Sequence, residues 1–140
     1  MAIIVGEAGD LSNYENPAKL WKRLGLGPYE GKAASTWRKA GGLSAEQWIE
    51  VGYSPRRRSA MWTIGDALIK GNDGAYKQLY DDRKAYEVER DPKMSKMHAH
   101  RRAQRYMEKR LVRDLWQAWR KAMVPVEPTA RVPSAKHQEA

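Results

Sequence analysis

Hydrophobic residues recur every three or four positions along most of the chain, which is the spacing of an α-helix that buries one face. Five segments show this spacing between residues that start or stop helices: 16–25, 44–52, 54–71, 74–90 and 95–123. No segment shows the sustained alternation of polar and apolar residues that is typical of strands. The pattern therefore predicts an all-α fold of about five helices, with one long basic C-terminal helix and a Gly-rich loop over 27–42.

The starts of three helices are marked by residues that cap helices. In two of them, a residue whose side chain can accept a hydrogen bond is followed by proline at the first helical position. In the third, such a residue is followed three positions later by glutamine, which is a capping-box pattern. These pairs are Asn16–Pro17, Ser54–Pro55 and Ser44–Gln47. The first apolar run, AIIVGEAGD over 2–10, fits either a strand or the end of a helix.

The long C-terminal segment carries two lines of residues at helical spacing. One is expected to be buried: Ala99, Ala103, Tyr106, Met107, Arg110, Leu111, Asp114, Leu115, Ala118, Trp119 and Ala122. The other is a basic line made of Arg102, Arg105, Lys109 and Arg113. Apolar stripes are expected in the two preceding helices as well, from Met61, Trp62, Ile64, Leu68 and Ile69, and from Tyr76, Leu79, Tyr80 and Tyr86. We expect residues 1–123 to form a single domain and 124–140, which contain three prolines, a flexible tail.

Charge adds a second signal to this helical pattern. The 140 residues include 26 Lys and Arg against 17 Asp and Glu, a net charge of +9. Residues 95–123 hold nine Lys and Arg and two acids, and so carry +7 of that charge. A basic balance favours polyanionic partners, nucleic acid before an acidic protein. The chain has no cysteine and no apolar run of about 20 residues, so we expect a cytoplasmic protein without disulfides, membrane contact or cofactor.

Basic and aromatic residues are the candidates for binding. Arg56, Arg57 and Arg58 begin a helix, where free backbone N–H groups already favour anions. Three cations at a helix start are unfavourable for the helix itself. Two explanations for them remain: contact with phosphate, or pairing with acids from elsewhere in the chain. In the Gly-rich loop, Trp37 and Arg38 could stack on a base or approach a groove.

Other chemistry-bearing residues are better explained by structure. His98 and His100 point in different directions on a helix and have no neighbouring ligands, so we expect exposed or capping histidines and no metal site. The acids of 81–91 alternate with Arg and Lys, which favours a salt-bridged solvent face over a Mg²⁺ site. Neither a Walker motif nor G-x-G-x-x-G occurs.

The order of motifs resembles the C-terminal domain of one family of insertion-sequence transposases, which join an N-terminal RuvC-like DEDD domain to a C-terminal domain that uses serine. The matching features are Gly9–Asp10, Tyr14, Asn16–Pro17, Leu20, Gly25–Leu26, Pro28, the stretch RRSAMW over 57–62, Tyr76, Tyr80, Arg83–Lys84 and KRLVRDLWQAWR over 109–120. They span residues 2–121, and the 140 residues contain no counterpart of the DEDD domain.

The resemblance implies a helical domain that contacts DNA and structured RNA and that comes from a mobile element or phage. It also implies a serine near the stretch YEGKAAST, where Ser35 is a weak counterpart. We therefore expect a small nucleic-acid-binding protein that is not catalytic alone, holding phosphates with the cations named above. Two alternatives remain: a phage-encoded protein that inhibits a host nucleic-acid-handling or defence complex, and a subunit that supplies Ser35 to a separate RuvC-like chain.

Overall fold

A computed structural model describes residues 2–28, 41–71 and 74–123 of the chain. Its helices are α1 (Ala2–Ala8), the short 3-10 helix η1 (Leu11–Asn13), α2 (Pro17–Arg23), α4 (Ala45–Val51), α5 (Pro55–Lys70), α6 (Gly74–Arg90) and α7 (Lys96–Met123). No strand occurs in the described ranges, so the all-α prediction is confirmed. The run over 2–10 is a helix, which makes six α-helices in this part of the chain where about five were expected. Most of the Gly-rich loop and the whole of 124–140 lie outside the described residues.

The predicted helix starts are present with their capping hydrogen bonds. The Asn16 side chain accepts from the backbone N–H of Lys19 at 3.1 Å, and Ser54 caps α5 in the same way. Ser44 and Gln47 form the reciprocal capping box in full. These contacts are local, so the sequence was sufficient to predict them.

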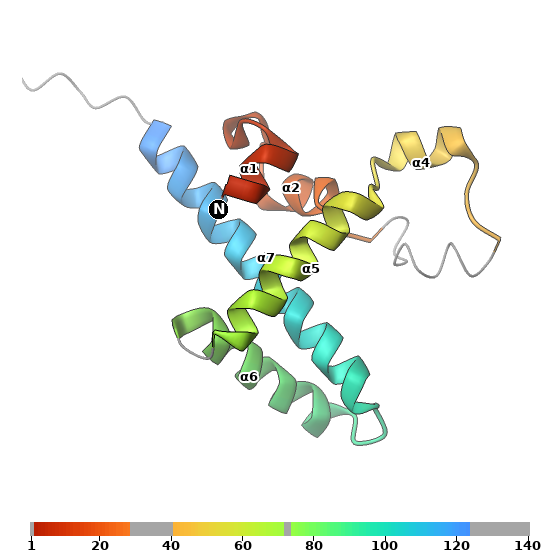
Figure 1. Ribbon diagram of the computed structural model, residues 1–140, viewed down its shortest axis with the longest axis vertical. Helices are drawn as coiled ribbons and strands as arrows, with labels where there is room; N and C mark the ends of the chain where they lie inside the picture. Colours follow the sequence, from red (N-terminus) through yellow and green to blue (C-terminus); the bar gives the residue numbers. More distant parts are fainter. Residues whose placement is uncertain (1, 29–40, 72–73, 124–140) are drawn as a thin grey trace, which may run out of the picture.

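Helix α7 is the spine of the molecule (Figure 1). Helices α1 and α2 lie at its C-terminal half, α6 runs back along its N-terminal half as a helical hairpin, and α5 crosses it near the middle. Helix α4 lies at the edge of the molecule. Both α5 and α6 therefore place side chains against α7, which carries most of the positive charge.

The apolar core is divided between the two halves of α7. One cluster joins the N-terminal helices to α5 and α7, with Ile4, Leu11, Leu20, Leu24, Leu26, Met61, Leu111 and Val112 buried. A smaller cluster of Tyr80, Ala103 and Met107 fills the space between α6 and α7. Gln104 and Glu108 are buried as well, on the side of α7 that faces Gly65 of α5. A polar layer thus lies at the crossing of α5 and α7.

Three tryptophans attach the N-terminal segment to α7 through their indole N–H groups. Trp21 donates to the backbone oxygen of Lys109 at 3.0 Å, and Trp116 donates to that of Tyr14 at 2.9 Å. Trp119 donates to the carboxylate of Asp10 at 3.0 Å. Each ring fills space while its polar atom is satisfied, so these tryptophans serve the fold rather than a binding surface.

The expected buried stripe of α7 is correct only in part. Ala99, Ala103, Met107 and Leu111 are buried. Three predicted members are exposed (Tyr106, Ala118 and Ala122), and three residues outside the prediction are buried (Gln104, Glu108 and Val112). The reason is that helices approach α7 from different sides along its length, so the buried face turns and no single stripe describes it. Trp62 and Tyr86, also predicted to be apolar stripe residues, are 47% and 49% exposed.

Candidate nucleic-acid interface

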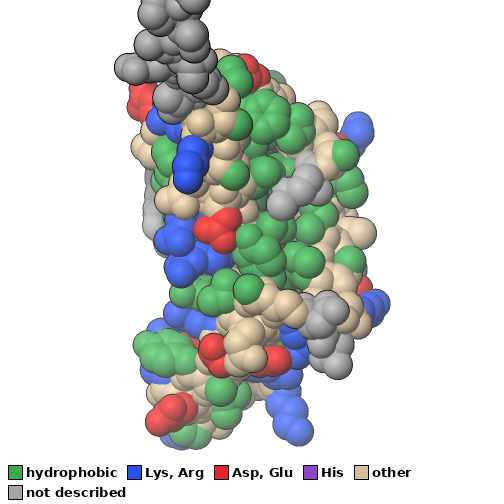
Figure 2. Space-filling view, turned by 90° about the vertical axis from the view of Figure 1, so that its left-hand side faces the viewer, with side chains coloured by type: hydrophobic (Ala, Val, Ile, Leu, Met, Phe, Trp, Pro, Cys, Tyr) green, Lys and Arg blue, Asp and Glu red, His purple; other side chains and the backbone are tan. Residues whose placement is uncertain are grey.

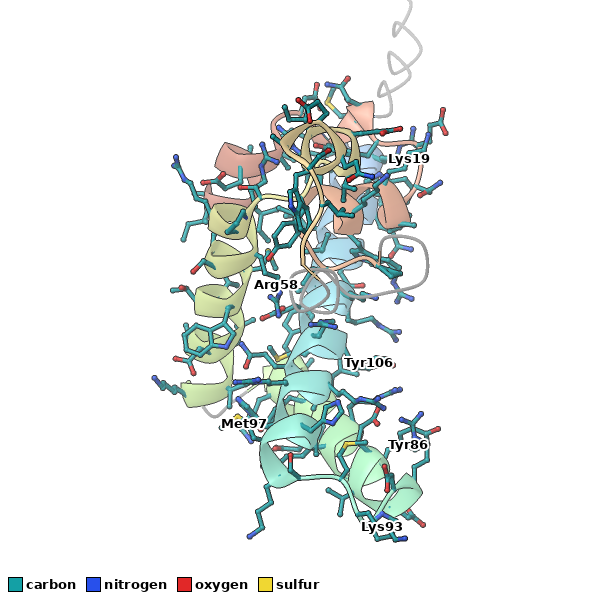
Figure 3. All side chains as sticks on the ribbon, turned by 90° about the vertical axis from the view of Figure 1, so that its right-hand side faces the viewer. Lys19, Arg58, Tyr86, Lys93, Met97 and Tyr106 are labelled. Carbon is teal, nitrogen blue, oxygen red and sulfur yellow. The ribbon has the colours of Figure 1, made fainter. Side chains whose placement is uncertain are left out.

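The three arginines at the start of α5 point to different partners. Arg56 lies on the surface, with Nε 3.2 Å from the carboxylate of Glu7 in α1. Arg58 reaches from α5 towards α7 (Figure 3), where its Nη1 lies 3.1 Å from Oε2 of Glu108. Arg57 makes no ion pair or side-chain hydrogen bond within the described residues. Pairing with acids from elsewhere, one of the two explanations for this run, therefore applies to Arg56 and Arg58.

Glu108 is a fully buried acid at the crossing of α5 and α7. Its carboxylate binds Arg58 and also accepts a 3.1 Å hydrogen bond from Nε2 of Gln104. Burial raises the pKa of Glu108 to about 7, although Arg58 and Gln104 oppose that rise. The helices approach closely enough for this contact because α5 has Gly65 there: a Cβ would overlap Oε1 of Glu108 and come within 2.9 Å of Nε2 of Gln104.

A cavity of about 230 Å³ opens between α5 and α7 beside this buried acid, and we call it the α5–α7 groove. It is lined by Arg58, Trp62, Arg101, Gln104 and Arg105. The Trp62 side chain stays 47% exposed. The groove therefore combines cationic groups with an accessible aromatic ring.

Gln104 leaves one acceptor unused at the base of this groove. Its Nε2 donates to the backbone oxygen of Trp62 at 3.0 Å as well as to Glu108, but its Oε1 is buried without a hydrogen-bond partner among the described residues. Buried polar atoms are usually satisfied, so an unpaired oxygen marks a position where a donor would be stabilising.

Arg105 lies in the groove close to a second guanidinium group. Partial burial and the neighbouring Arg58 guanidinium lower the pKa of Arg105, although the charge of Glu108 opposes them and Arg105 stays charged at neutral pH. It makes no ion pair, hydrogen bond or ring contact within the part of the chain that the structure describes. An anion bound between these two guanidinium groups would relieve their repulsion.

The other members of the predicted basic line have structural contacts. Arg102 binds Glu87 at 3.2 Å, Lys109 lies 5.3 Å from the centre of the Trp21 ring, and Arg113 lies 3.6 Å from the carboxylate of Asp114. Partial burial and Arg105 lower the pKa of Lys109. Their spacing still keeps all four cations on one side of α7.

Glu87 differs from the solvent-face acid that the sequence predicted. Its side chain is 1% exposed and is bound by Arg83, Arg90 and Arg102 at 2.6, 2.8 and 3.2 Å. Burial raises the pKa of Glu87, but the hydrogen bonds from Arg83 and Arg102 and the charges of Arg83 and Arg90 outweigh it and hold the pKa below its usual range. The prediction of a solvent-exposed Glu87 was wrong because the α6–α7 hairpin brings Arg102 over α6. Such a tertiary contact cannot be predicted from helical periodicity.

The histidines also have separate structural roles. His98 is exposed and its Nε2 accepts from Arg102, whereas His100 is half-buried with Nδ1 2.7 Å from the Tyr80 hydroxyl. The sequence predicted an exposed or a capping histidine, and His100 is neither. Burial lowers the pKa of His100. In the described ranges no three metal-ligating side chains come together, and no helix is long and apolar enough to cross a membrane.

The sequence predicted part of this interface and missed the rest. Arg58 and Arg105 were predicted, but Arg101 and Gln104 were not, and Trp62 was predicted to be buried. The spacing of Arg58 and Trp62, and of Arg101 and Arg105, is four residues in each helix, which places each pair on one face. That the two faces adjoin depends on the α5–α7 crossing. Ser35, Trp37 and Arg38 lie outside the described residues.

Comparisons with protein-family models, with curated proteins and with solved structures find no match to this chain. The transposase resemblance, and with it a mobile-element or phage origin and a role for Ser35 beside a RuvC-like chain, stays a prediction.

Proposed function

We propose that the protein binds nucleic acid through the α5–α7 groove and the basic side of α7. The observation that carries this proposal is the groove itself, which Arg58, Arg101 and Arg105 line together with an exposed indole. Arginine is suited to phosphate because its guanidinium offers several N–H donors in one plane. An adjacent aromatic ring is the usual platform for a base.

The distribution of charge supports the same function. The only two acids of 95–123 do not cancel its cations at the groove, since Glu108 is buried beneath Arg58 and Asp114 lies beside Arg113. Arg101 and Arg105 thus make no ion pair with an acid in the described residues, although the charge of the buried Glu108 acts on Arg105. Polyanion binding is favoured where such charges are concentrated, because each phosphate contact releases counterions.

The proposal is tested by titrating fluorescently labelled single-stranded and duplex oligonucleotides at low salt and following anisotropy. Replacing Arg101 and Arg105 by alanine should weaken binding about tenfold or more, since two charge-assisted contacts are lost. Arg58 is left in place because its removal would leave the buried Glu108 without its ion-pair partner and would disturb the crossing of α5 and α7.

The matched control is the pair Lys93→Ala and Lys121→Ala, which removes two exposed charges from the α6–α7 turn and from the far end of α7. This variant should bind as the wild type does. Failure of the wild type to bind either oligonucleotide at low salt would contradict the proposal, and so would equal losses in the two variants.

A second candidate function, binding to another protein, is favoured by a different surface. Hydrophobic side chains gather through the middle of the face in Figure 2, with Lys and Arg at its left edge. A shallow hollow of about 440 Å³ between α6 and α7 has Tyr76, Leu79, Arg110 and Arg113 in its wall. Apolar, tyrosine and arginine side chains together are typical of protein interfaces.

For this candidate the partner would be a nucleic-acid-handling or defence complex with an acidic surface. A stoichiometric complex that survives nuclease treatment and dissociates when Arg110 and Arg113 are replaced would support it. A complex lost on nuclease treatment would instead show that nucleic acid bridges the two proteins.

A further inference from the structure

The α5–α7 groove is a recess between two helices rather than a protruding face. Its volume of about 230 Å³ lies below the 300–1,000 Å³ typical of pockets for drug-sized ligands. In a duplex the bases are stacked and paired, so only backbone or groove edges reach a protein surface. A recess of this size is therefore accessible to a base only when that base is unstacked.

The lining of the groove matches the parts of one nucleotide. Trp62 offers a 47% exposed ring for stacking, and Arg101 and Arg105 offer charge for phosphate. Gln104 forms the buried polar base of the groove, where its Nε2 is held by the backbone oxygen of Trp62 and by Glu108. An aromatic platform beside paired cations is the arrangement by which proteins hold single strands.

The position of Trp62 is hard to explain by folding alone. The three tryptophans at the other end of α7 donate their N–H groups to protein acceptors and pack against the core. The Trp62 side chain belongs to neither core cluster and donates no hydrogen bond within the described residues. An exposed indole that lines a groove together with cations is suited to stack on a base.

We infer that the α5–α7 groove holds one unpaired nucleotide of a nucleic-acid strand, with its base on Trp62 and its phosphate between Arg101 and Arg105. This inference rests on the proposed nucleic-acid binding and adds to it a preference for unpaired segments. The protein would then bind single strands, loops or strand ends.

Trp62→Ala tests the inference with three labelled ligands: a single-stranded oligonucleotide, the same strand with abasic sites in place of its bases, and a blunt duplex. The substitution should weaken binding to the single strand about 5- to 150-fold, as expected for the loss of 1–3 kcal/mol of stacking. Binding to the abasic strand and to the duplex should not change. Trp62→Phe, which keeps a ring, should retain most of the affinity.

Tyr86→Ala is the matched control, because Tyr86 is 49% exposed and lies on α6, away from Arg58 (Figure 3). It should leave all three affinities unchanged. Circular dichroism and thermal unfolding confirm that each variant is folded, and a misfolded Trp62→Ala is replaced in the test by Trp62→Leu.

The outcomes separate this inference from the proposed function. Wild-type protein that binds no ligand contradicts both. Wild-type protein that binds the single strand and the duplex, with equal affinity loss or none in Trp62→Ala, contradicts only the unpaired-nucleotide site. Competition by free adenosine monophosphate at the concentration at which the strand binds would overturn the choice of a strand as the occupant, and absence of such competition supports it.

Discussion

At the scale of single residues, Glu108 determines what the neighbouring cations can do. The buried carboxylate takes up Arg58, which the sequence had offered as a phosphate ligand. It also orients Gln104, whose Nε2 is shared between Glu108 and the backbone of Trp62. Arg101 and Arg105 make no ion pair within the described residues, although the charge of Glu108 also acts on Arg105. Glu108 therefore binds one arginine of the groove directly and leaves the guanidinium groups of the other two without a hydrogen-bonded acid.

The burial of Glu108 predicts a specific dependence of stability on pH. Its pKa is raised to about 7 when folded, from the ordinary 4.5, so between these values the folded protein binds the extra proton. The free energy of unfolding should therefore fall as the pH rises from 5 to 8, by up to about 3 kcal/mol from this group. Glu108→Gln should remove this contribution and be more stable than the wild type at pH 8.

Urea denaturation of the wild type and Glu108→Gln at pH 5 and pH 8 measures the difference. The comparison is needed because His100, whose pKa is lowered by burial, acts in the opposite direction: its contribution is lost as the pH falls below about 6.5. This effect is common to both proteins and cancels. Parallel pH profiles for the two proteins would show that Glu108 does not titrate in this range.

At the scale of elements, the crossing of α5 and α7 creates the groove, and Gly65 makes the crossing possible. Glycine in the middle of a helix costs about 1 kcal/mol relative to alanine. Here it leaves the space that Glu108 and Gln104 fill. The helix accepts an unfavourable residue because the close approach of α5 to α7 depends on it.

Gly65→Ala should lower the free energy of unfolding by about 1 to 3 kcal/mol, because overlap with Glu108 outweighs the better helix propensity. Gly6→Ala is its counterpart in α1, where an added Cβ meets nothing within 4 Å. That substitution should raise stability by about 0.5 kcal/mol. Chemical denaturation of both variants measures these changes in the free energy of unfolding. If Gly65→Ala stabilised the protein as Gly6→Ala does, the close-packed crossing would be contradicted.

The same elements show why the sequence was informative about some features and silent about others. Ser44 and Gln47 lie three residues apart in one helix, so their capping box is a local event that can be read from the chain. Glu108 and Arg58 are separated by 50 residues and meet only because α5 crosses α7. Trp62 was predicted to lie in the apolar stripe because its position fits the helical spacing. That spacing does not show where the neighbouring helix leaves the ring uncovered.

At the scale of the whole molecule, the long α7 gathers most of the net charge of +9 onto one helix. Its two halves are attached by different means, tryptophan anchors at the C-terminal half and the α6 hairpin at the N-terminal half. The groove lies beside the crossing that links them. Association with a polyanion through such a surface should depend steeply on salt.

The most direct test of nucleic-acid binding is the slope of log Kobs against log salt concentration for a single-stranded oligonucleotide. Each phosphate contact contributes about −0.7 to that slope. Because both arginines hold one phosphate, the slope for Arg101→Ala with Arg105→Ala should be shallower than that of the wild type by about 0.7, while Lys93→Ala with Lys121→Ala should leave it unchanged. Equal slopes for the wild type and the groove variant would contradict the account, because the two cations would then contact no phosphate.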